Sequence, residues 1–466
     1  MDNENDCKNA PKPYRYKYYN TYYPTIYNPM RLRDLIFNRP LTQHHDKPVK
    51  SKFIRQVQYD KKLNHKLYGY GETVRNNTLT YLFNINNGGA TYIEIKGGEI
   101  VYVQNLFNDN YVNRFSNKLV QGFNGLAYQQ RKNLALYNKP FNNHVFPVRD
   151  AQHWTSNGNL INMIDYREVP QSYISAILDM LQYTLKRHKV HDVAFIFWNK
   201  DHLILRKDLR EPHFYILDQP IPADLTYDKY LPILSQSSHV DFMEVPIPTA
   251  EDWAYLTEKF YTPDCNTTTL QNILQIPWAD KLPIGFFRGS STGEHNDRRN
   301  PRINITYLSQ EHPDLLDAGI TQFVRRDKFV NGNIVFANGR ADHPNLTLKG
   351  RIPMHEQSKY KYVIYIQGNT AAYRFMYMFF LQSVIFRVST PYYLWFERML
   401  VPYVHYIPVK ADLSDLIDKL NWARANDDKC KTIAENSYKF ARTYFTCDKM
   451  AEYMAYLLNK IAYIPS

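Results

Sequence analysis

The chain has 466 residues, which is too long for a single hydrophobic core and predicts two or three domains. Its hydrophobic fraction of 44% is that of a soluble globular protein, and its four dispersed cysteines exclude a disulfide framework or a structural metal site. The net charge of +12 comes from scattered lysines and arginines, which favours an anionic small molecule as ligand and leaves nucleic-acid binding as an open alternative.

The first half of the chain begins with a polar, tyrosine-rich stretch, residues 1–50, which predicts an extended arm. A β-rich extension is expected over residues 51–150. Within it, alternating strands at 91–95 and 99–103 flank the pair Gly97-Gly98, which is typical of a hairpin.

From residue 170 the apolar period becomes helical, with one apolar face between Ile174 and Leu185. The continuous apolar run Val193–Phe197 follows and predicts a strand that is buried on both faces. Shorter strands are expected at 214–217 and 240–245. A helix followed by a buried strand is one half of an α/β unit.

A second α/β unit is clearer. A strand is expected at 363–366, a turn with a helix N-cap at Gly368–Thr370, a helix at 371–381 and a further strand at 384–388, which completes a crossover. Arg374 is expected near the first turn of that helix, where backbone N–H groups and the helix dipole favour an anion. Three helices are expected to close the chain.

Two segments of this second unit favour a phosphate-linked ligand. In Gly285–Gly293, Arg288 stands beside glycines and hydroxyl residues after an apolar run, which suits a strand that leads into a phosphate-binding loop. An ordinary surface turn explains this loop equally well by itself. The second segment, Gly368–Arg374, combines the same residue types, and the pair favours a pocket for an activated donor.

Other donor sites are excluded by missing motifs. The phosphate loop of nucleoside triphosphatases and the kinase catalytic signatures are absent, and no Asp-x-Asp pair is present to hold a metal with the diphosphate. Asp201 is the candidate general base, because it follows a buried strand and ligands bind at the carboxyl ends of such strands. A solvated loop aspartate is the alternative interpretation.

Ordered segments from Asp192 to Ser466 resemble glycosyltransferase family 90, which holds the Rumi-type (KTEL-containing) protein O-glucosyltransferases and the fungal capsule-associated xylosyltransferases. The upstream part is similar to the lipopolysaccharide-modifying-enzyme-like version carried by large DNA viruses. The segments that carry the resemblance are, in order, Asp192–Phe195 with Asp201, Glu211-Pro212, Leu231–Ser235, Ile247–Thr249 with Asp252-Trp253, Arg288–Gly293, Asn300–Arg302, Leu316–Thr321, Lys359–Tyr362, Gly368 with Arg374, Ser383-Val384, Trp395–Glu397 and Pro402–Lys410.

The resemblance implies an α/β, GT-B-like fold, in which two Rossmann-type domains face a central cleft behind the N-terminal β-containing extension. The acceptor-side domain with the base would cover residues 151–275 and the nucleotide-sugar-binding domain residues 276–440. The C-terminal helix, within 441–466, would pack back on the N-terminal half.

The activity that the resemblance implies is the transfer of glucose or xylose from a UDP-sugar to a hydroxyl of a protein, glycan or lipid acceptor. The transfer would be inverting and metal-independent, with no cofactor apart from the donor substrate. The base falls on Asp201, and the diphosphate-binding residues are Arg288, Gly289, Ser290, Thr292, Gly293 and Arg374.

The chain departs from the family pattern Asn-x-Arg-Asp-aromatic-Pro around the base, with Trp198, Lys200, His202 and Leu203 at the changed positions, and these changes bear on the acceptor. A catalytically inactive descendant that serves as a virion or interaction protein is the alternative. No secretory signal is present and no apolar stretch could span a bilayer. The expected location is therefore cytoplasmic, which means the host cytoplasm or virus factory if the chain is viral. Packaging in the virion is the alternative location.

Overall fold

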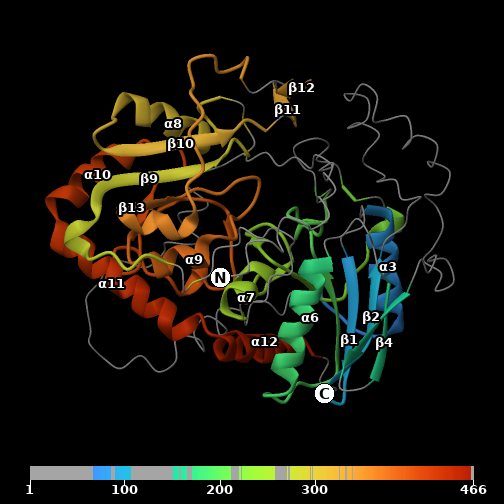
Figure 1. Cartoon of the computed structure of the whole chain (residues 1–466). Helices are drawn as coiled ribbons and strands as arrows, with labels where there is room; N and C mark the ends of the chain where they lie inside the picture. Colours follow the sequence, from blue (N-terminus) through green and yellow to red (C-terminus); the bar gives the residue numbers. More distant parts are fainter. Residues whose placement is uncertain are drawn as a thin grey trace.

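The computed structural model describes residues 67–85, 90–106, 151–156, 159–164, 171–210, 212, 220, 221, 223–257, 270, 273–293, 295, 297–324, 326–330, 333–337 and 340–462. The predicted arm at 1–50 and the strand expected at 214–217 lie outside the described residues. Two five-stranded sheets, one in each half of the described chain, form the framework (Figure 1).

The first sheet has the strand order β2-β1-β5-β6-β8. The predicted hairpin is confirmed, since β1 and β2 pair antiparallel across Gly97 and Gly98, whose φ angles of 59° and 81° suit glycine. β1 also pairs with β5, so the hairpin is part of this sheet. The five strands are β1 (Ala90–Lys96), β2 (Glu99–Leu106), β5 (Val193–Trp198), β6 (Ile233–Ser235) and β8 (Val245–Pro246).

The part of this sheet nearest the second half is parallel, because β5, β6 and β8 run in one direction. β5 is buried on both faces, as its continuous apolar run predicts. Phe195 and Phe197 lie in one apolar cluster, and Ile196 and Trp198 lie in another. The strand expected at 240–245 is wrong except for its last residue, since residues 240–244 form a turn and an irregular connection before β8.

The second sheet is parallel throughout and has the order β10-β9-β13-β14-β16. Numbered along the chain this order is 2-1-3-4-5, which is the doubly wound order of flavodoxin-like folds. Alternate residues of β13 enter two cores, with Ile364 facing α10 and α11 and Val363 facing the interior between the halves. The strands are β9 (Leu282–Ser290), β10 (Leu316–Gln322), β13 (Tyr360–Tyr365), β14 (Val384–Val388) and β16 (Ile407–Val409).

The helix predicted at 371–381 is shorter than expected. Only α9 (Phe375–Met378) and a 3₁₀ turn at Phe379–Leu381 are helical. The four preceding residues are held differently, because the Ala372 N–H donates to the Tyr365 hydroxyl at 3.0 Å and Phe375 stacks on the same ring. A four-residue helix has almost no macrodipole. Arg374 is the N-cap of α9, as predicted, but so short a helix adds little to the attraction for an anion, which stays a prediction for this position.

The three predicted closing helices are confirmed as α10 (Leu416–Ala425), α11 (Asp427–Tyr444) and α12 (Cys447–Ile461). α12 begins at the N-cap Thr446, whose side chain accepts the N–H of Lys449. It leaves the second half and packs against α6 (Gln171–Leu185) and α7 (Ala250–Thr257), as Figure 1 shows. The Tyr453 hydroxyl donates to the Pro246 carbonyl at 2.7 Å and ties α12 to the first sheet.

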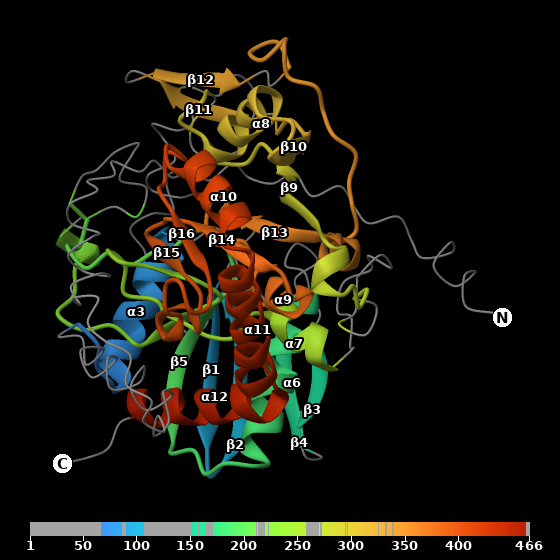
Figure 2. The ribbon, with the colours of Figure 1, turned by 90° about the vertical axis from the view of Figure 1, so that its left-hand side faces the viewer.

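A second connection joins the halves near the cleft side of both sheets. β7 (Ser238–His239) pairs antiparallel with β15 (Tyr392–Tyr393), although 153 residues separate His239 from its partner Tyr392 in sequence. One hydrophobic cluster also runs through both halves and includes Leu181, Trp253 and Phe375. The two α/β units with a terminal helix that crosses back form a GT-B-like α/β fold (Figure 2).

The remaining described elements cover the sheets or project from them. Among the described helices, none has the length and apolar character needed to cross a membrane. These elements are α3 (Glu72–Ile85), β3 (Ala151–Ser156), β4 (Asn159–Ile164), α8 (Pro301–Glu311), β11 (Arg326–Val330), β12 (Asn333–Ala337) and 3₁₀ turns at Ala223–Leu225, Trp278–Asp280, Met354–Lys359 and Glu397–Met399.

Candidate functional site

The second sheet reverses its winding between β9 and β13, and this switch point determines where a ligand can bind. In doubly wound sheets the loops that follow the two strands at the switch point diverge and leave a crevice at their carboxyl ends. The loop after β9 begins at Ser291, and the loop after β13 contains Gly368. The two segments that the sequence singles out are therefore the two loops at the switch point.

These two loops touch each other, and glycine permits the contact. The Gly293 N–H donates to the side-chain oxygen of Asn369 at 3.1 Å. A Cβ at Gly368 would lie 2.7 Å from the Thr292 hydroxyl oxygen, and one at Gly293 would lie 2.8 Å from Asn300. Larger residues would thus separate the loops. The structure brings the two predicted segments together.

Arg302, at the start of α8, fills the junction between the loops. Its guanidinium donates to the Thr292 hydroxyl at 2.6 Å and to the Ser290 carbonyl at 3.2 Å on one side. On the other side it donates to the carbonyls of Ile366 and Gln367 at 3.0 Å and 2.8 Å. All these acceptors are neutral, so Arg302 brings an uncompensated charge into the junction.

Arg374 approaches the same place from the other loop. Its guanidinium donates to the Arg288 carbonyl at 2.8 Å. A Cβ on Gly289 would lie 3.4 Å from a guanidinium nitrogen of Arg302 and 3.5 Å from one of Arg374. Both cations therefore flank Gly289, and its missing side chain leaves space between them.

The electrostatics of this arginine pair favour an anion. Burial lowers the pKa of Arg302 to about 9, and the charge of Arg374 lowers it further in the same direction. Burial also lowers the pKa of Arg374, against the opposing effect of Tyr365 and Tyr255. Within the part of the chain that the structure describes, no carboxylate forms an ion pair with either arginine. Two desolvated like charges are stabilised by a bound anion such as a diphosphate.

Arg288, which the family resemblance implies as a diphosphate-binding residue, is paired with Asp317 in this structure, and its role in binding stays a prediction. Successive residues of a strand lie on opposite faces, so Arg288 and Gly289 are on opposite faces of β9. Its guanidinium forms a bidentate ion pair with Asp317, at 2.7 Å and 2.9 Å, and donates to the carbonyls of Asp317 and Gly350. Its donors are used within the fold.

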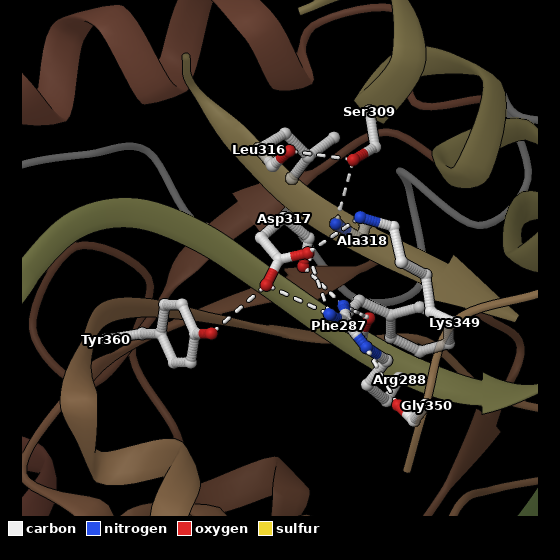
Figure 3. A network of polar contacts seen from close by, with 9 residues as sticks. All are labelled: Phe287, Arg288, Ser309, Leu316, Asp317, Ala318, Lys349, Gly350 and Tyr360. Carbon is white, nitrogen blue, oxygen red and sulfur yellow. Dashed lines mark hydrogen bonds and ion pairs between the residues drawn. The ribbon is translucent and has the colours of Figure 1, made fainter. Parts of the chain in front are cut away.

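Asp317 joins three neighbouring strands through this network. Its carboxylate also accepts from the Tyr360 hydroxyl at 3.1 Å and from Lys349 at 3.3 Å (Figure 3). Burial alone would raise the pKa of Asp317, but the hydrogen bonds and charges of Arg288, Tyr360 and Lys349 outweigh it and lower the pKa. An anionic Asp317 neutralises Arg288, so this arginine has a structural role on its side of the sheet.

Asp201 enters the site from the first half of the chain. It follows β5, and as a residue it is exposed to solvent. Burial nevertheless raises the pKa of its carboxyl, while the charge of Lys200 and a hydrogen bond from Tyr373 act in the opposite direction. A carboxyl that water reaches on one side while protein surrounds the rest is suited to meet an incoming hydroxyl. Because Tyr373 directly precedes Arg374, the Asp201 carboxylate is near the segment Gly368–Arg374.

The loop that carries Asp201 is anchored by buried side chains. The Trp198 indole N–H donates to the His202 carbonyl, and the two rings pack edge to face at 5.0 Å. Glu244 accepts the N–H groups of Ile204 and Leu205. Trp198 and His202 both stand at positions where the chain departs from the family pattern. They contact each other, and this contact holds the turn after Asp201 in place.

Arg302 and Tyr373 were not among the site residues predicted from the sequence. Arg302 had a detectable signal, because Asn300-Pro301 is a strong helix start and places the following arginine beside the preceding loop. Tyr373 had none, because its contact with Asp201 joins two distant parts of the chain.

Comparison with known proteins identifies the family. The model of the Glycosyl transferase family 90 matches residues 149–464. "Uncharacterized protein 035R" of Invertebrate iridescent virus 3 is 30% identical over 402 residues, which cover 83% of this chain and 36% of that protein. Human "Protein O-glucosyltransferase 3" is 31% identical over 232 residues, which cover 50% of this chain and 42% of that protein.

A solved structure, that of Anabaena HepE in complex with UDP and glucose, shows a weak similarity, with a TM-score of 0.32 and 10% identity over 64% of this chain and 77% of that chain. The chain spans less than half the length of the two curated relatives named above. The family match nevertheless extends over β5, β6 and β8 of the first sheet, the whole second sheet and the closing helices. The chain therefore belongs to glycosyl transferase family 90.

Proposed function

We propose that the protein transfers a sugar, glucose or xylose, from a UDP-sugar to a hydroxyl of a protein, glycan or lipid acceptor by an inverting, metal-independent single displacement. One observation carries the proposal. The Asp201 carboxyl, from the first half of the chain, is near enough to Tyr373 for that side chain to lower its pKa, and the following residue, Arg374, belongs to a buried arginine pair without a carboxylate partner among the described residues. A base and an anion site thus meet where the halves meet.

Asp201 removes the proton from the acceptor hydroxyl as that oxygen attacks the anomeric carbon. General base catalysis of this kind contributes about 10²–10⁴-fold to the rate. Burial raises the pKa of Asp201, which strengthens its carboxylate as a base. Attack from the side opposite the diphosphate inverts the anomeric centre.

Arg302 and Arg374 stabilise the negative charge that grows on the leaving diphosphate as the sugar–phosphate bond breaks. The missing side chain of Gly289 leaves room for the phosphates beside the two guanidinium groups. Two guanidinium groups supply the positive charge that a divalent ion supplies in other transferases, which supports metal-independent transfer.

The relatives support the choice of reaction class. Several of them carry the name protein O-glucosyltransferase, and these match this chain at 29–31% identity. A glucosyl donor is therefore the first candidate, and xylose differs from it only by the missing hydroxymethyl group.

The test is the Asp201→Asn variant, with transfer from UDP-glucose and UDP-xylose measured in EDTA. Transfer should fall by at least about 10²-fold, because the amide cannot accept the proton. UDP affinity, measured by calorimetry, should stay within about twofold of the wild type, because the arginine pair is intact. Transfer that persists in the variant would place the base elsewhere. A wild-type protein that binds UDP and transfers no sugar would instead favour the catalytically inactive descendant.

A further inference from the structure

We propose that Asn199 and Gln236 form a subsite for the hydroxyl groups of the donor sugar, beside the anion site that holds its diphosphate. This inference rests on the proposed function, since it names residues that recognise the sugar to be transferred. Neither residue is among those that the family resemblance implies. Asn199 stands at the open position of the pattern Asn-x-Arg-Asp-aromatic-Pro, and the matching segment Leu231–Ser235 ends before Gln236.

The two residues follow neighbouring strands at the carboxyl edge of the first sheet. β5 and β6 are parallel, and Phe197 pairs in register with Leu234. Both of these side chains lie in the apolar cluster that extends into the second half. Asn199 and Gln236 each follow two residues later, so the alternation of the two strands carries them to the same face. Ligands of such sheets bind at this edge.

The chain after Gln236 runs toward the second half. Ser238 begins β7, which pairs with β15. Two residues before β15, the Thr390 hydroxyl donates to the side-chain oxygen of Gln367. Gln367 directly precedes Gly368, so the end of β6 lies near the loop after β13, which contributes to the anion site. A sugar attached to the bound diphosphate therefore reaches this edge of the first sheet.

The Asn199 side chain has hydrogen-bonding capacity that the fold does not use. The residue is 8% exposed, and its Oδ1 atom is buried without a hydrogen-bond partner among the described residues. Buried polar atoms of folded proteins are nearly always paired, so an unpaired one beside a candidate site points to a ligand. A hydroxyl of the sugar supplies the missing donor.

Gln236 offers the complementary group. Its Oε1 accepts the Ala250 N–H, at the start of α7, at 2.8 Å, which fixes the orientation of the amide. The NH2 group of the same amide is then the donor that remains for a ligand. Together the two amides present an acceptor and a donor, which match hydroxyl groups because a hydroxyl both donates and accepts. Both amides are uncharged, so they suit the neutral sugar rather than its diphosphate.

Two substitutions test the inference. Asn199→Leu keeps the approximate size of the side chain and removes the amide, and Gln236→Glu keeps an oxygen for Ala250 and removes the NH2 donor. Asn76→Leu is the matched control, because Asn76 in α3 also has a buried Oδ1 atom without a hydrogen-bond partner among the described residues. Calorimetry gives the affinities for UDP-glucose and for UDP. The readout is their ratio, in which an effect on the diphosphate cancels.

UDP-glucose affinity relative to UDP affinity should fall about 3- to 10-fold in Asn199→Leu and in Gln236→Glu, which is the effect of one lost hydrogen bond. Asn76→Leu should keep the wild-type ratio. The Tm of ligand-free Asn199→Leu should not fall, because the substitution breaks no hydrogen bond within the fold.

A ratio within about twofold of the wild-type value in either site variant overturns the inference, and so does a clear loss of Tm in Asn199→Leu, which would show that the amide is paired within the fold. Wild-type protein that binds UDP-glucose and transfers no sugar rejects the proposed catalysis, and the affinity ratio then still decides the subsite. Wild-type protein that binds neither ligand overturns both.

Discussion

At the scale of single residues, three arginines near Gly289 have different partners, and the partner determines the role. Arg288 is neutralised by Asp317, whereas Arg302 donates to carbonyls and a hydroxyl, and Arg374 donates to a carbonyl. Charge that the fold neutralises contributes little attraction for a ligand. The anion site is therefore expected at Arg302 and Arg374.

The same substitution at two arginines tests this distinction. Arg302→Gln should weaken UDP binding about 10- to 100-fold, because charge-assisted hydrogen bonds to the diphosphate are lost. Arg288→Gln should leave UDP affinity within about threefold and mainly destabilise the fold, by about 1–3 kcal/mol, since Asp317 is left partly buried without its counter-ion. Calorimetry gives the affinities and urea unfolding gives the stabilities. If Arg288→Gln weakened UDP binding more than Arg302→Gln did, Arg288 would be the residue that binds the diphosphate.

At the scale of secondary-structure elements, the start of α7 connects the two halves. Thr249 and Asp252 form a reciprocal capping box, in which each side chain accepts the backbone N–H of the other residue. The same Asp252 oxygen accepts the Trp395 indole N–H at 3.0 Å from the second half. Burial raises the pKa of Asp252 to about 7, although these hydrogen bonds act in the opposite direction.

This carboxyl makes stability depend on pH. Because its folded pKa of about 7 lies above its ordinary value of 3.8, the folded protein favours the neutral form. Its stabilising contribution is complete below pH 4 and is lost as the pH rises through 7. Glu244, with a pKa raised to about 7 by burial, adds an effect of the same sign. Asp252→Asn removes one of the two titrations.

The Tm of the wild type should therefore fall relative to that of Asp252→Asn between pH 5 and pH 8, as measured by differential scanning calorimetry. The matched control is Asp314→Asn, since the Asp314 side chain is 74% exposed, and its Tm difference from the wild type should not change with pH. A constant Tm difference for Asp252→Asn across this range would show that Asp252 does not titrate there.

At the scale of the whole molecule, several contacts among the described residues hold the halves together. β7 pairs with β15, α12 packs on α6 and α7, and one apolar cluster extends through both halves. Opening a hinge between the halves would expose part of this cluster to water. The free-energy cost is about 25 cal/mol for each Å² of apolar surface exposed. The relative position of base and donor loops is therefore set before any ligand binds.

Small-angle X-ray scattering tests this arrangement. The radius of gyration of the protein should be the same with and without saturating UDP, because the contacts between the halves keep them in one arrangement. Guanidinium chloride below the unfolding transition provides the positive control for a loosened molecule. A clear decrease in the radius of gyration on UDP addition would instead demonstrate domain closure.

Much of the fold could be predicted from the sequence, because the signals involved are local. Gly97-Gly98 needs positive φ angles that glycine adopts, and β5 is apolar at every position because both of its faces are buried. The phosphate-loop candidates were recognised from glycines and hydroxyls within single segments. Each of these features is determined by residues that are neighbours in the chain.

The start of α9 and the roles of the arginines depended on tertiary contacts. The helix begins late because Tyr365, seven residues earlier, accepts the N–H of Ala372, and Arg288 is neutralised by a carboxylate on another strand. The sequence by itself determined which segments form strands, turns and cationic loops. Only the tertiary structure decided which cation is paired with a carboxylate and which is surrounded by neutral acceptors, because charge compensation depends on distance in space and not on position along the chain.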